Sequence, residues 1–409
     1  MILANARLLF PDRLARGHVR VLEGKIAALA EPALEPFAGE PVIDLAGCFL
    51  APGFIDLHIH GALRRDTMEA NADAFATICR HHARGGTTSL ALTTITATTE
   101  EILRVLRAVE AYRADQPGDG AQVLGVHLEG PYFSHQKPGA HRQELIRDPK
   151  REEWKQFLAH PGVITQITLA PELPGALELI EALVARGIRA SAGHSDAWAA
   201  DAAAAFARGL RQATHTFNCM STARRRGPFR EAGLLEFVLS EPEILCEVIA
   251  DGRHVSPTLL RMLYQAKGPD GIALITDATA GAGLAEEQAF KLGDLPCVVR
   301  DGVGLTADGQ TLAGSTASMI RVVRGMVELA GVPLVEAVRM ATLTPARALG
   351  IESQKGRLAI GADADLVSFT DDFQVTHTFI AGRDVLASHS GLAAHEQAAD
   401  VPEPDPQQR

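Results

Sequence analysis

Two histidines stand two residues apart at the end of an apolar segment that covers residues 52–60. Because side chains alternate along a β-strand, Asp56, His58 and His60 would share one face, and the apolar residues between them would point the other way. Neutral imidazole binds divalent transition metals, so two histidines at one strand end could meet on one metal ion. The alternative for this motif alone is a pair of polar residues at a strand end without a metal.

Four further residues with metal-binding side chains each end another apolar segment, and they are Glu129, His194, His215 and Asp277. In a parallel β/α barrel the carboxyl ends of the strands converge on one face, where catalytic side chains gather. Each residue alone could be an ordinary hydrogen-bonded polar group, but the six together predict a metal centre. Nitrogen and oxygen ligands without sulfur suit Zn²⁺, Fe²⁺, Co²⁺ or Mn²⁺.

The predicted chemistry is hydrolysis of an amide bond. A divalent metal lowers the pKa of a bound water from 15.7 to roughly 7 and polarises a carbonyl oxygen, which makes amide cleavage feasible at neutral pH. Asp277 would accept the proton of that water and return it to the departing amine, first as general base and then as general acid.

The elements that must position these residues form a repeating pattern from about residue 53 to about residue 277. Short apolar, β-branched segments alternate there with longer helical patterns, which is typical of βα units and a parallel sheet. The candidate strands are 54–60, 87–93, 122–129, 163–169, 188–193, 212–216, 244–250 and 272–277. Eight βα units favour a (β/α)8 TIM barrel, which is an α/β fold, over an open sheet.

The two ends of the chain contain short antiparallel strand patterns. Residues 1–51 and 349–390 are each too short to bury a core, so we expect them to combine into one small β-sandwich domain. The catalytic barrel would then cover residues 52–348, with hairpins inserted at 286–313 after the eighth strand. Residues 391–409 are rich in proline and are predicted to be a flexible tail.

The composition excludes several classes of partner. The 409 residues include 39 Lys and Arg against 50 Asp and Glu, a net charge of −11, so no basic field would attract nucleic acid or an anionic membrane. An anionic substrate would need a local basic pocket. Five cysteines without a Cys-x-x-Cys pair predict neither disulfides nor a thiolate zinc site. The absence of a signal-like start and of a long apolar run predicts a cytoplasmic protein.

Further motifs run through the chain in a fixed order, and they occupy residues 58–60, 127–131, 137–141, 193–197, 215–220, 250–254, 276–278, 312–315, 339–346 and 361–366. Their order and spacing closely resemble the N-acetylglucosamine-6-phosphate deacetylase family of the amidohydrolase superfamily. The resemblance covers nearly the whole chain except the tail. It implies hydrolysis of the N-acetyl amide of N-acetylglucosamine 6-phosphate to glucosamine 6-phosphate and acetate, a reaction of amino-sugar metabolism.

The resemblance also implies how one or two divalent metal ions would be bound, with zinc as the expected metal. Glu129, His194 and His215 would hold the main metal ion. His58 and His60 would allow a second one, which some members of the family lack.

Catalytic and substrate-binding roles follow from the same resemblance. Asp277 matches the catalytic acid and base and can also bind metal, while His141 matches a residue that contacts the substrate and polarises the acetyl carbonyl. The positions that match substrate contacts are Ala140, His141, Asn218, Cys219, Arg226, Asp251, His254, Leu312, Ala313 and Gly314.

Two segments depart from the family's pattern: residues 61–66 replace a loop richer in glycine, and residues 224–230 replace an Arg-Glu-Pro-Gly-like stretch. The arginine of that stretch reaches the phosphate held by a neighbouring subunit, which implies a homodimer. Arg226 is the best match by its distance from Met220, and Arg230 is the alternative. Guanidinium groups suit bidentate phosphate binding, so this arginine-rich segment is a candidate anion site; a solvated basic loop is the other interpretation.

Two other functions remain open. The same metal centre could act on a different N-acyl substrate, such as N-acetylgalactosamine 6-phosphate or an N-acyl amino acid, because a fold and a metal do not fix the substrate. A catalytically silent scaffold with this fold is the third possibility, although such a protein should have lost metal ligands and this chain has every ligand type.

Other histidines carry less signal. His127 lies two residues before Glu129 on the same face, which favours a buried core histidine over one that supports the metal ligands. His81 and His82 lie near the end of a predicted helix and are expected to be solvated.

Overall fold

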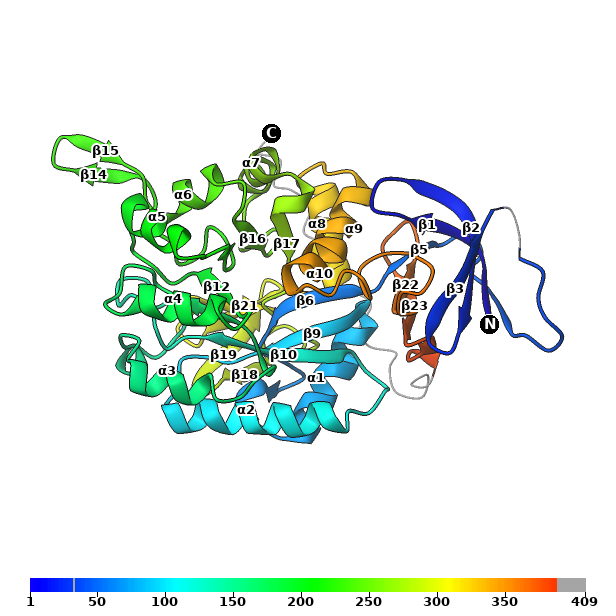
Figure 1. The fold of residues 1–409 in the computed structure, drawn as a ribbon, viewed down its shortest axis with the longest axis horizontal. Coiled ribbons are helices and arrows are strands. Elements are labelled where there is room, and N and C mark those ends of the chain that lie inside the picture. Colours follow the sequence, from blue (N-terminus) through cyan, green and yellow to red (C-terminus); the bar gives the residue numbers. More distant parts are fainter. Residues whose placement is uncertain (32–33, 388–409) are drawn as a thin grey trace.

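Eight parallel strands form the centre of the molecule, and they lie in the same order as in the chain (Figure 1). The computed structural model describes residues 1–31 and 34–387. The strands are β6 (Phe54–Ile59), β9 (Thr87–Thr93), β10 (Gln122–Glu129), β11 (Ile164–Leu169), β12 (Arg189–Ala192), β13 (Gln212–Ala213), β16 (Leu245–Val248) and β17 (Ile272–Leu274). Each lies within one of the predicted segments, so the predicted strands and the α/β barrel fold are confirmed.

The barrel closes where β6 meets the end of β17, through isolated backbone hydrogen bonds and through side-chain hydrogen bonds. The Asp277 N–H donates to the His58 carbonyl at 2.9 Å. The Asp56 carboxylate accepts two hydrogen bonds from Thr276, one from its backbone N–H at 3.2 Å and one from its hydroxyl at 2.6 Å. Burial raises the pKa of Asp56 to about 7, with these hydrogen bonds acting against it. Closure places the end of β6 beside the start of the loop after β17.

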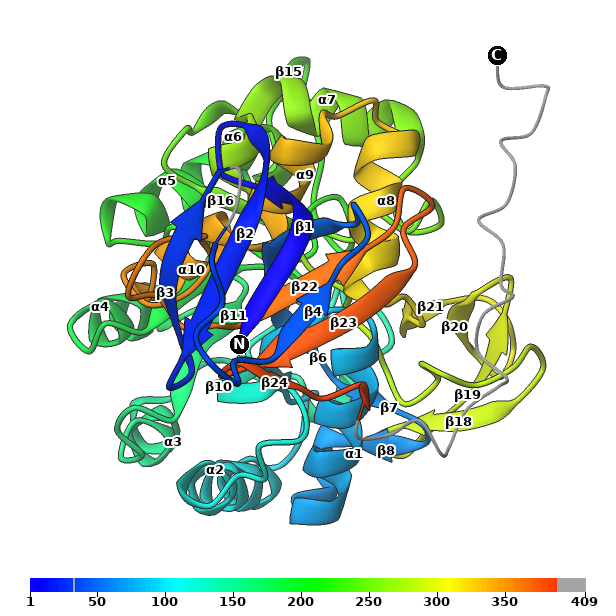
Figure 2. The same cartoon turned by 90° about the vertical axis from the view of Figure 1, so that its right-hand side faces the viewer.

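Helices surround the strands (Figures 1 and 2). They are α1 (Ala72–Arg84), α2 (Thr99–Ala114), α3 (Arg151–Phe157), α4 (Ala176–Val184), α5 (Ala199–Ala207), α6 (Leu234–Ser240), α7 (Pro257–Lys267), α8 (Met319–Glu328), α9 (Leu334–Ala341) and α10 (Leu343–Leu349). Side-chain caps fix where they begin: Asn71 accepts from the Ala74 N–H at 2.9 Å ahead of α1, and Thr98 and Glu101 form a reciprocal capping box ahead of α2. No helix in the described ranges is long and apolar enough to cross a membrane.

One prediction about α1 is wrong. The ring of His82 is buried, and its Nε2 lies 3.1 Å from the carbonyl oxygen of Gly61, while His81 is half-buried. The loop after β6 packs over the end of this helix and covers the ring. The hydrophobic periodicity of the helix alone could not predict that this loop would bury His82.

The two ends of the chain form one eight-stranded sheet beside the barrel (Figure 2). Its strands are β1 (Ile2–Leu9), β2 (Leu14–Leu22), β3 (Lys25–Ala30), β4 (Val42–Asp44), β5 (Phe49–Pro52), β22 (Leu366–Phe369), β23 (Val375–Ile380) and β24 (Arg383–Asp384). Strands β5 and β22 join the two segments as an antiparallel pair, and Leu3, Leu50, Leu366 and Phe379 are buried in a shared apolar core. The predicted β-domain made from both ends is therefore confirmed, whereas the predicted tail at 391–409 lies outside the described residues.

Two insertions extend the barrel. A four-stranded antiparallel sheet follows β17, with strands β18 (Ala289–Leu292), β19 (Leu295–Arg300), β20 (Val303–Thr306) and β21 (Leu312–Ser315). The hairpin β14 (Arg224–Arg226) and β15 (Phe229–Glu231) projects from the barrel, away from the terminal β-domain (Figure 1). Short elements complete the fold: β7 (Gly61–Ala62), β8 (Arg65–Asp66) and the 3-10 helices η1 (Thr67–Glu69), η2 (Gln143–Leu145) and η3 (Pro269–Gly271).

Candidate metal centre

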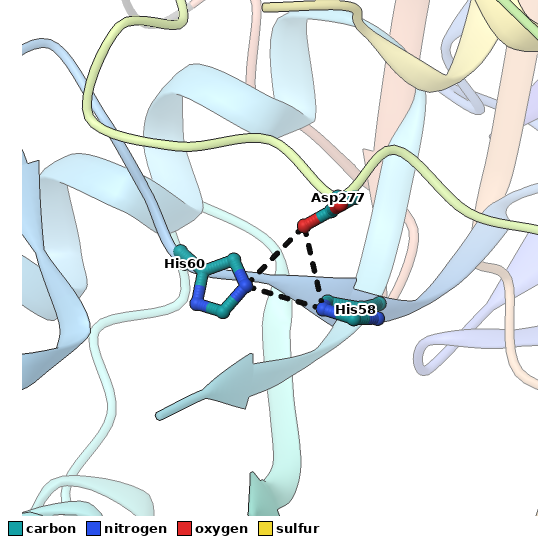
Figure 3. A group of neighbouring side chains, drawn as sticks. All are labelled: His58, His60 and Asp277. Atoms are coloured by element: carbon teal, nitrogen blue, oxygen red, sulfur yellow. Dashed lines mark hydrogen bonds and ion pairs between the residues drawn. The ribbon is translucent and has the colours of Figure 1, made fainter. Parts of the chain in front are cut away.

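His58, His60 and Asp277 face one another at the closure of the barrel (Figure 3). The Nε2 atoms of the two histidines are 3.2 Å apart. Oδ1 of Asp277 lies 3.4 Å from Nε2 of His58 and 3.3 Å from Nε2 of His60. All three residues are buried, and their ligand atoms are close enough together to hold one metal ion.

A second group surrounds Glu129, the last residue of β10. Oε1 of Glu129 lies 3.1 Å from Nε2 of His215 and 3.4 Å from Nε2 of His194. Those two nitrogens are 3.0 Å apart. The other oxygen of Glu129, Oε2, lies 3.2 Å from Nε2 of His60. Glu129 therefore lies between the two groups, and the structure brings all six residues predicted as metal ligands together.

This donor set fits divalent cations. Burial opposes a charge on His60, but the Asp277 and Glu129 carboxylates raise its pKa to about 9. Such a cluster takes up protons when no other cation is present, and a metal ion replaces those protons when it binds. His58, His60 and Asp277 form one group whose ligand atoms are close enough to hold a divalent metal, and Glu129, His141 and His194 form another, through imidazole nitrogen and carboxylate oxygen alone. His215 joins the second group through its short distances to Glu129 and His194.

The backbone at three of these residues is strained. His194, His215 and Asp277 each follow a barrel strand and have positive φ angles of 49°, 30° and 49°. Residues other than glycine rarely adopt positive φ angles, and each residue in this conformation costs on the order of 1–3 kcal/mol of folding free energy. Strain of this kind persists where the surroundings hold it and is common at functional sites. Here it turns three side chains toward the same point.

The hydrogen bond that His141 accepts fixes its tautomer. The Thr96 backbone N–H donates to Nδ1 of His141 at 3.1 Å, so in the neutral ring the proton must lie on Nε2. Burial lowers the pKa of His141 to about 4, which keeps the ring neutral. Nε2 lies 3.4 Å from Oε2 of Glu129, beside the metal ligands. His141 is thus a neutral hydrogen-bond donor directed into the site.

His194 has the opposite tautomer. Its Nδ1 lies 2.9 Å from the carbonyl oxygen of Lys137, which can only accept a hydrogen bond, so in the neutral ring the proton lies on Nδ1 and Nε2 has the free lone pair. Phe133 stacks on the ring, with centroids 4.1 Å apart. The ring is thereby held in the orientation that a metal ligand needs.

A cavity of about 330 Å³ opens above these residues, within the range of roughly 300–1,000 Å³ that is usual for small-molecule sites. All the predicted metal ligands except His58, which is fully buried, line it. The predicted substrate contacts that line it are Ala140, His141, Asn218, Cys219, His254, Leu312 and Gly314. Those that the structure does not place in its wall are Arg226, Asp251 and Ala313.

His254 is the wall residue best suited to carry positive charge toward a substrate. Its Nδ1 lies 2.7 Å from Oδ2 of Asp251, which is buried behind it. Burial lowers the pKa of His254, but the negative charge of Asp251 outweighs this and raises it above the ordinary value. Among the described residues that line the cavity there is neither lysine nor arginine.

The arginine-rich segment forms the projecting hairpin β14–β15 (Figure 1). Arg224 pairs with Asp196 at 2.6 Å, and its guanidinium carbon lies 4.0 Å from the centre of the Trp198 ring. Arg226 is more exposed, with 61% of its side chain accessible and Glu231 at 3.5 Å. Neither arginine lines the cavity of its own chain.

Several residues near the centre were not predicted from the sequence. Leu292, Gln310 and Thr311 also reach the cavity from the inserted sheet, in addition to the predicted Leu312 and Gly314. Glu247 lies fully buried beneath His58. The sequence could have indicated Glu247, because it is an acidic residue in the middle of an apolar strand segment.

His127 is buried, as expected, and its Nε2 lies 2.7 Å from Oγ1 of Thr168. The ring also packs edge-on against His58, with centroids 4.5 Å apart. His127 therefore contacts a predicted ligand as well as the barrel core.

The barrel, with this cluster at the carboxyl ends of its strands, defines a metal-dependent hydrolase. Residues 49–385 match the Amidohydrolase family, and the chain belongs to that family.

Within the family, the chain is similar to amino-sugar phosphate deacetylases. It is 36% identical to N-acetylglucosamine-6-phosphate deacetylase of Vibrio furnissii over 87% of this chain and 88% of that protein. It is also 36% identical to N-acetylgalactosamine-6-phosphate deacetylase of Escherichia coli O157:H7, over 93% of this chain and 98% of that protein. The crystal structure of N-acetylglucosamine-6-phosphate deacetylase from Pasteurella multocida has a TM-score of 0.86 at 33% identity and covers 94% of this chain and 98% of that one.

Proposed function

We propose that this enzyme hydrolyses the N-acetyl amide of N-acetylglucosamine 6-phosphate and releases glucosamine 6-phosphate and acetate. The observation that carries the proposal is the convergence of Glu129, His141 and Asp277 on one cavity above the buried histidines. Relatives named for this reaction, at more than 30% identity over most of the chain, support the choice of substrate.

Asp277 is the proposed acid and base. Burial raises the pKa of its carboxyl, but His58 and His60 outweigh this and hold it below the ordinary value, so Asp277 is ionised and can accept a proton. It takes the proton of the attacking water, whose oxygen bonds to the carbonyl carbon. When the C–N bond breaks, Asp277 returns this proton to the departing nitrogen.

His141 acts on the carbonyl oxygen. Its Nε2–H, fixed by the Thr96 N–H on the other ring nitrogen, donates to that oxygen as negative charge develops there. A divalent metal held by the cluster would polarise the same carbonyl and lower the pKa of the water. We propose zinc, with His58, His60 and Asp277 holding one ion and with Glu129, His194 and His215, whose ligand atoms lie within 3.4 Å of one another, holding the other.

We propose that His254 and an arginine from a second copy of the chain bind the phosphate. His254 alone supplies at most one charge, and the hairpin that carries Arg226 points away from its own barrel (Figure 1). Phe229, at the turn of this hairpin, is 70% exposed, which suits a surface that packs against another subunit. A homodimer in which each hairpin reaches the other cavity would complete both sites.

N-acetylgalactosamine 6-phosphate is the second candidate substrate. The relative named for that sugar is as similar to this chain as the relative named for the gluco epimer, at 36% identity in both cases. The two sugars differ only at one hydroxyl group, and the amide and phosphate chemistry is the same for both.

The test is acetate release from N-acetylglucosamine 6-phosphate, N-acetylgalactosamine 6-phosphate and unphosphorylated N-acetylglucosamine, compared by kcat/KM. The zinc-loaded enzyme should prefer one phosphorylated sugar, and chelator-treated enzyme should lose activity and regain it with added zinc. Equal rates with and without phosphate would overturn the phosphate assignment. Less than about a tenth of an equivalent of metal after reconstitution would instead favour the silent scaffold.

A further inference from the structure

A carboxylate lies beneath the metal centre, inside the barrel, and the mechanism above does not use it. Glu247 is in the middle of β16 and has no exposed surface. Its Oε2 is 3.5 Å from Nδ1 of His58, on the side of that ring away from Asp277. Among the described residues, neither of these two atoms has any other hydrogen-bond partner.

The other oxygen of Glu247 is fully occupied by amide donors. Oε1 accepts from Nε2 of Gln166 at 2.9 Å and from Nε2 of Gln212 at 2.6 Å. Both amides are buried, so their orientation matters. The two amide donors occupy Oε1, which leaves Oε2 as the acceptor that faces His58.

Arg189 fixes which way these amides point. A guanidinium group can only donate, and Nε of Arg189 lies 2.6 Å from Oε1 of Gln212. The Gln212 NH₂ group must therefore face Glu247 and Oε1 of Gln166, which is 2.8 Å away. Since that oxygen accepts, the Gln166 NH₂ group must also donate to Glu247. A chain of donors that begins at Arg189 thus ends on one carboxylate.

We propose that Glu247 is a positioning residue for His58. Its Oε2 accepts the proton on Nδ1 of His58, so the Nε2 lone pair of that ring is directed toward His60 and Asp277. Histidine ligands commonly donate their second ring proton to a carboxylate, and loss of that partner lowers metal affinity roughly 10–100-fold. The proposal rests on the proposed metal centre but does not depend on which sugar is the substrate.

The two groups of ligands differ in the hydrogen-bond partner that faces the second ring nitrogen of their histidines. In the group around Glu129, His194 donates to a backbone carbonyl, whereas His58 faces the side-chain carboxyl group of Glu247. Glu247 should therefore strengthen the group of His58, His60 and Asp277 selectively. It would help to determine whether this enzyme binds one metal ion or two.

The substitution Glu247→Gln tests this sharply. The donors of Gln166 and Gln212 require an oxygen at the Oε1 position, so the new NH₂ group must face Nδ1 of His58. That forces Nδ1 to accept and moves the proton to Nε2, which is the wrong tautomer for a metal ligand. The substitution preserves shape and removes the carboxylate charge.

The experiment measures zinc bound per chain at buffered free zinc concentrations, together with the tautomer of His58 by ¹⁵N NMR of histidine-labelled protein. We expect two equivalents for the wild type, and for Glu247→Gln a second equivalent that binds roughly 10–100-fold more weakly while the first is unchanged. Glu247→Asp, which keeps the charge, should restore part of this affinity. The matched control is Glu153→Gln, which removes a partly buried carboxylate that pairs with Arg147 on the outside of the barrel and should leave both equivalents unchanged.

A purely structural Glu247 would give a different result. Glu247→Gln would then lower the melting temperature but bind both zinc equivalents as tightly as the wild type, which would overturn the proposal. The wild-type spectrum tests it without any variant, because a proton on Nε2 of His58 in the zinc-loaded protein also contradicts it. A wild type that binds no zinc would overturn the proposed metal centre itself.

Discussion

The two parts of the proposed active site, one for metal and one for phosphate, differ in how far the residues of one chain supply them. The metal-binding part is buried, and its side chains come from the ends of barrel strands and the residues directly after them. For an anion, the same chain offers His254 in the cavity wall, while the candidate arginines, Arg226 and Arg230, lie on a projecting hairpin. Bond-breaking groups need positions fixed to about half an ångström, which rigid strands provide, whereas a recognition charge can come from another subunit.

Substitution of Glu129 should have the largest effect, because its oxygens face both groups of metal ligands. Glu129→Ala should lose the main metal ion and activity toward every substrate, phosphorylated or not. Metal analysis after dialysis and acetate release measure this. His58→Ala is the comparison and should lose at most one equivalent. Full metal content in Glu129→Ala contradicts its assignment as a ligand.

Asp277→Asn should lower kcat by roughly 10²–10⁴ or more, because the amide cannot accept the proton of the attacking water. The metal ion held by Glu129, His194 and His215 should remain, so a metal assay separates this loss from the one above. The loss should be the same for phosphorylated and unphosphorylated sugars. Activity within about tenfold of the wild type would mean that Asp277 is not the acid and base.

Arg226→Ala should weaken only the anion-binding part. Loss of the bidentate, charge-assisted hydrogen bonds between an arginine and the phosphate costs on the order of 2–4 kcal/mol. This corresponds to a decrease of roughly 30- to 1,000-fold in kcat/KM for the phosphorylated sugar. The unphosphorylated sugar should be almost unaffected. Arg230→Ala decides between the two arginines, and equal small effects of both on both substrates would remove the hairpin from the phosphate site.

Mixing of chains tests whether the arginine crosses between subunits. A mixed dimer of Arg226→Ala and Asp277→Asn chains contains one cavity with an intact Asp277 and an arginine from its partner. Such mixtures should regain part of the activity that each variant lacks. If the hairpin served its own cavity instead, no composite site would form and the mixture would show only the average of the two variants.

Asp251→Asn should have the smallest effect, and one that depends on pH. Asp251, together with the weaker influence of Asp277, raises the pKa of His254, so the wild-type ring stays protonated to higher pH. In the variant that pKa falls, and kcat/KM for the phosphorylated sugar should begin to drop at a lower pH than in the wild type. At low pH, where both rings are protonated, the two enzymes should converge. A pH profile identical to that of the wild type would exclude His254 as a phosphate-binding cation.

The sequence indicated which of the predicted metal ligands come together, because these residues follow the periodicity of their strands. His58 and His60 alternate with apolar neighbours, and Glu129 closes an apolar run, so side-chain direction and strand end together indicate one site. The closure of the barrel by Asp56 and Thr276 could not be foreseen, since it joins the first and last strands through side-chain atoms.

The proposed phosphate-binding residues were harder to predict from the sequence, for a physical reason. Arg226 and Arg230 occupy an exposed hairpin whose direction depends on tertiary packing, and no hydrophobic pattern distinguishes a solvated arginine from one that reaches another subunit. Gln310 likewise reaches the cavity only because the inserted sheet folds back. Residues that depend on such long-range packing leave little trace in local sequence.

The joining of both chain ends in one sheet has a consequence for synthesis on the ribosome. Lys25 pairs with Asp363, 338 positions later, and β5 forms a ladder with β22. The first strands to emerge must therefore wait for nearly the whole barrel to be translated before the sheet can be completed, and contacts between such distant residues form slowly. During that interval the edge of β5 is open to pairing with other chains, so a nascent-chain chaperone that covers residues 1–52 should raise the yield of folded enzyme more than one acting on the barrel.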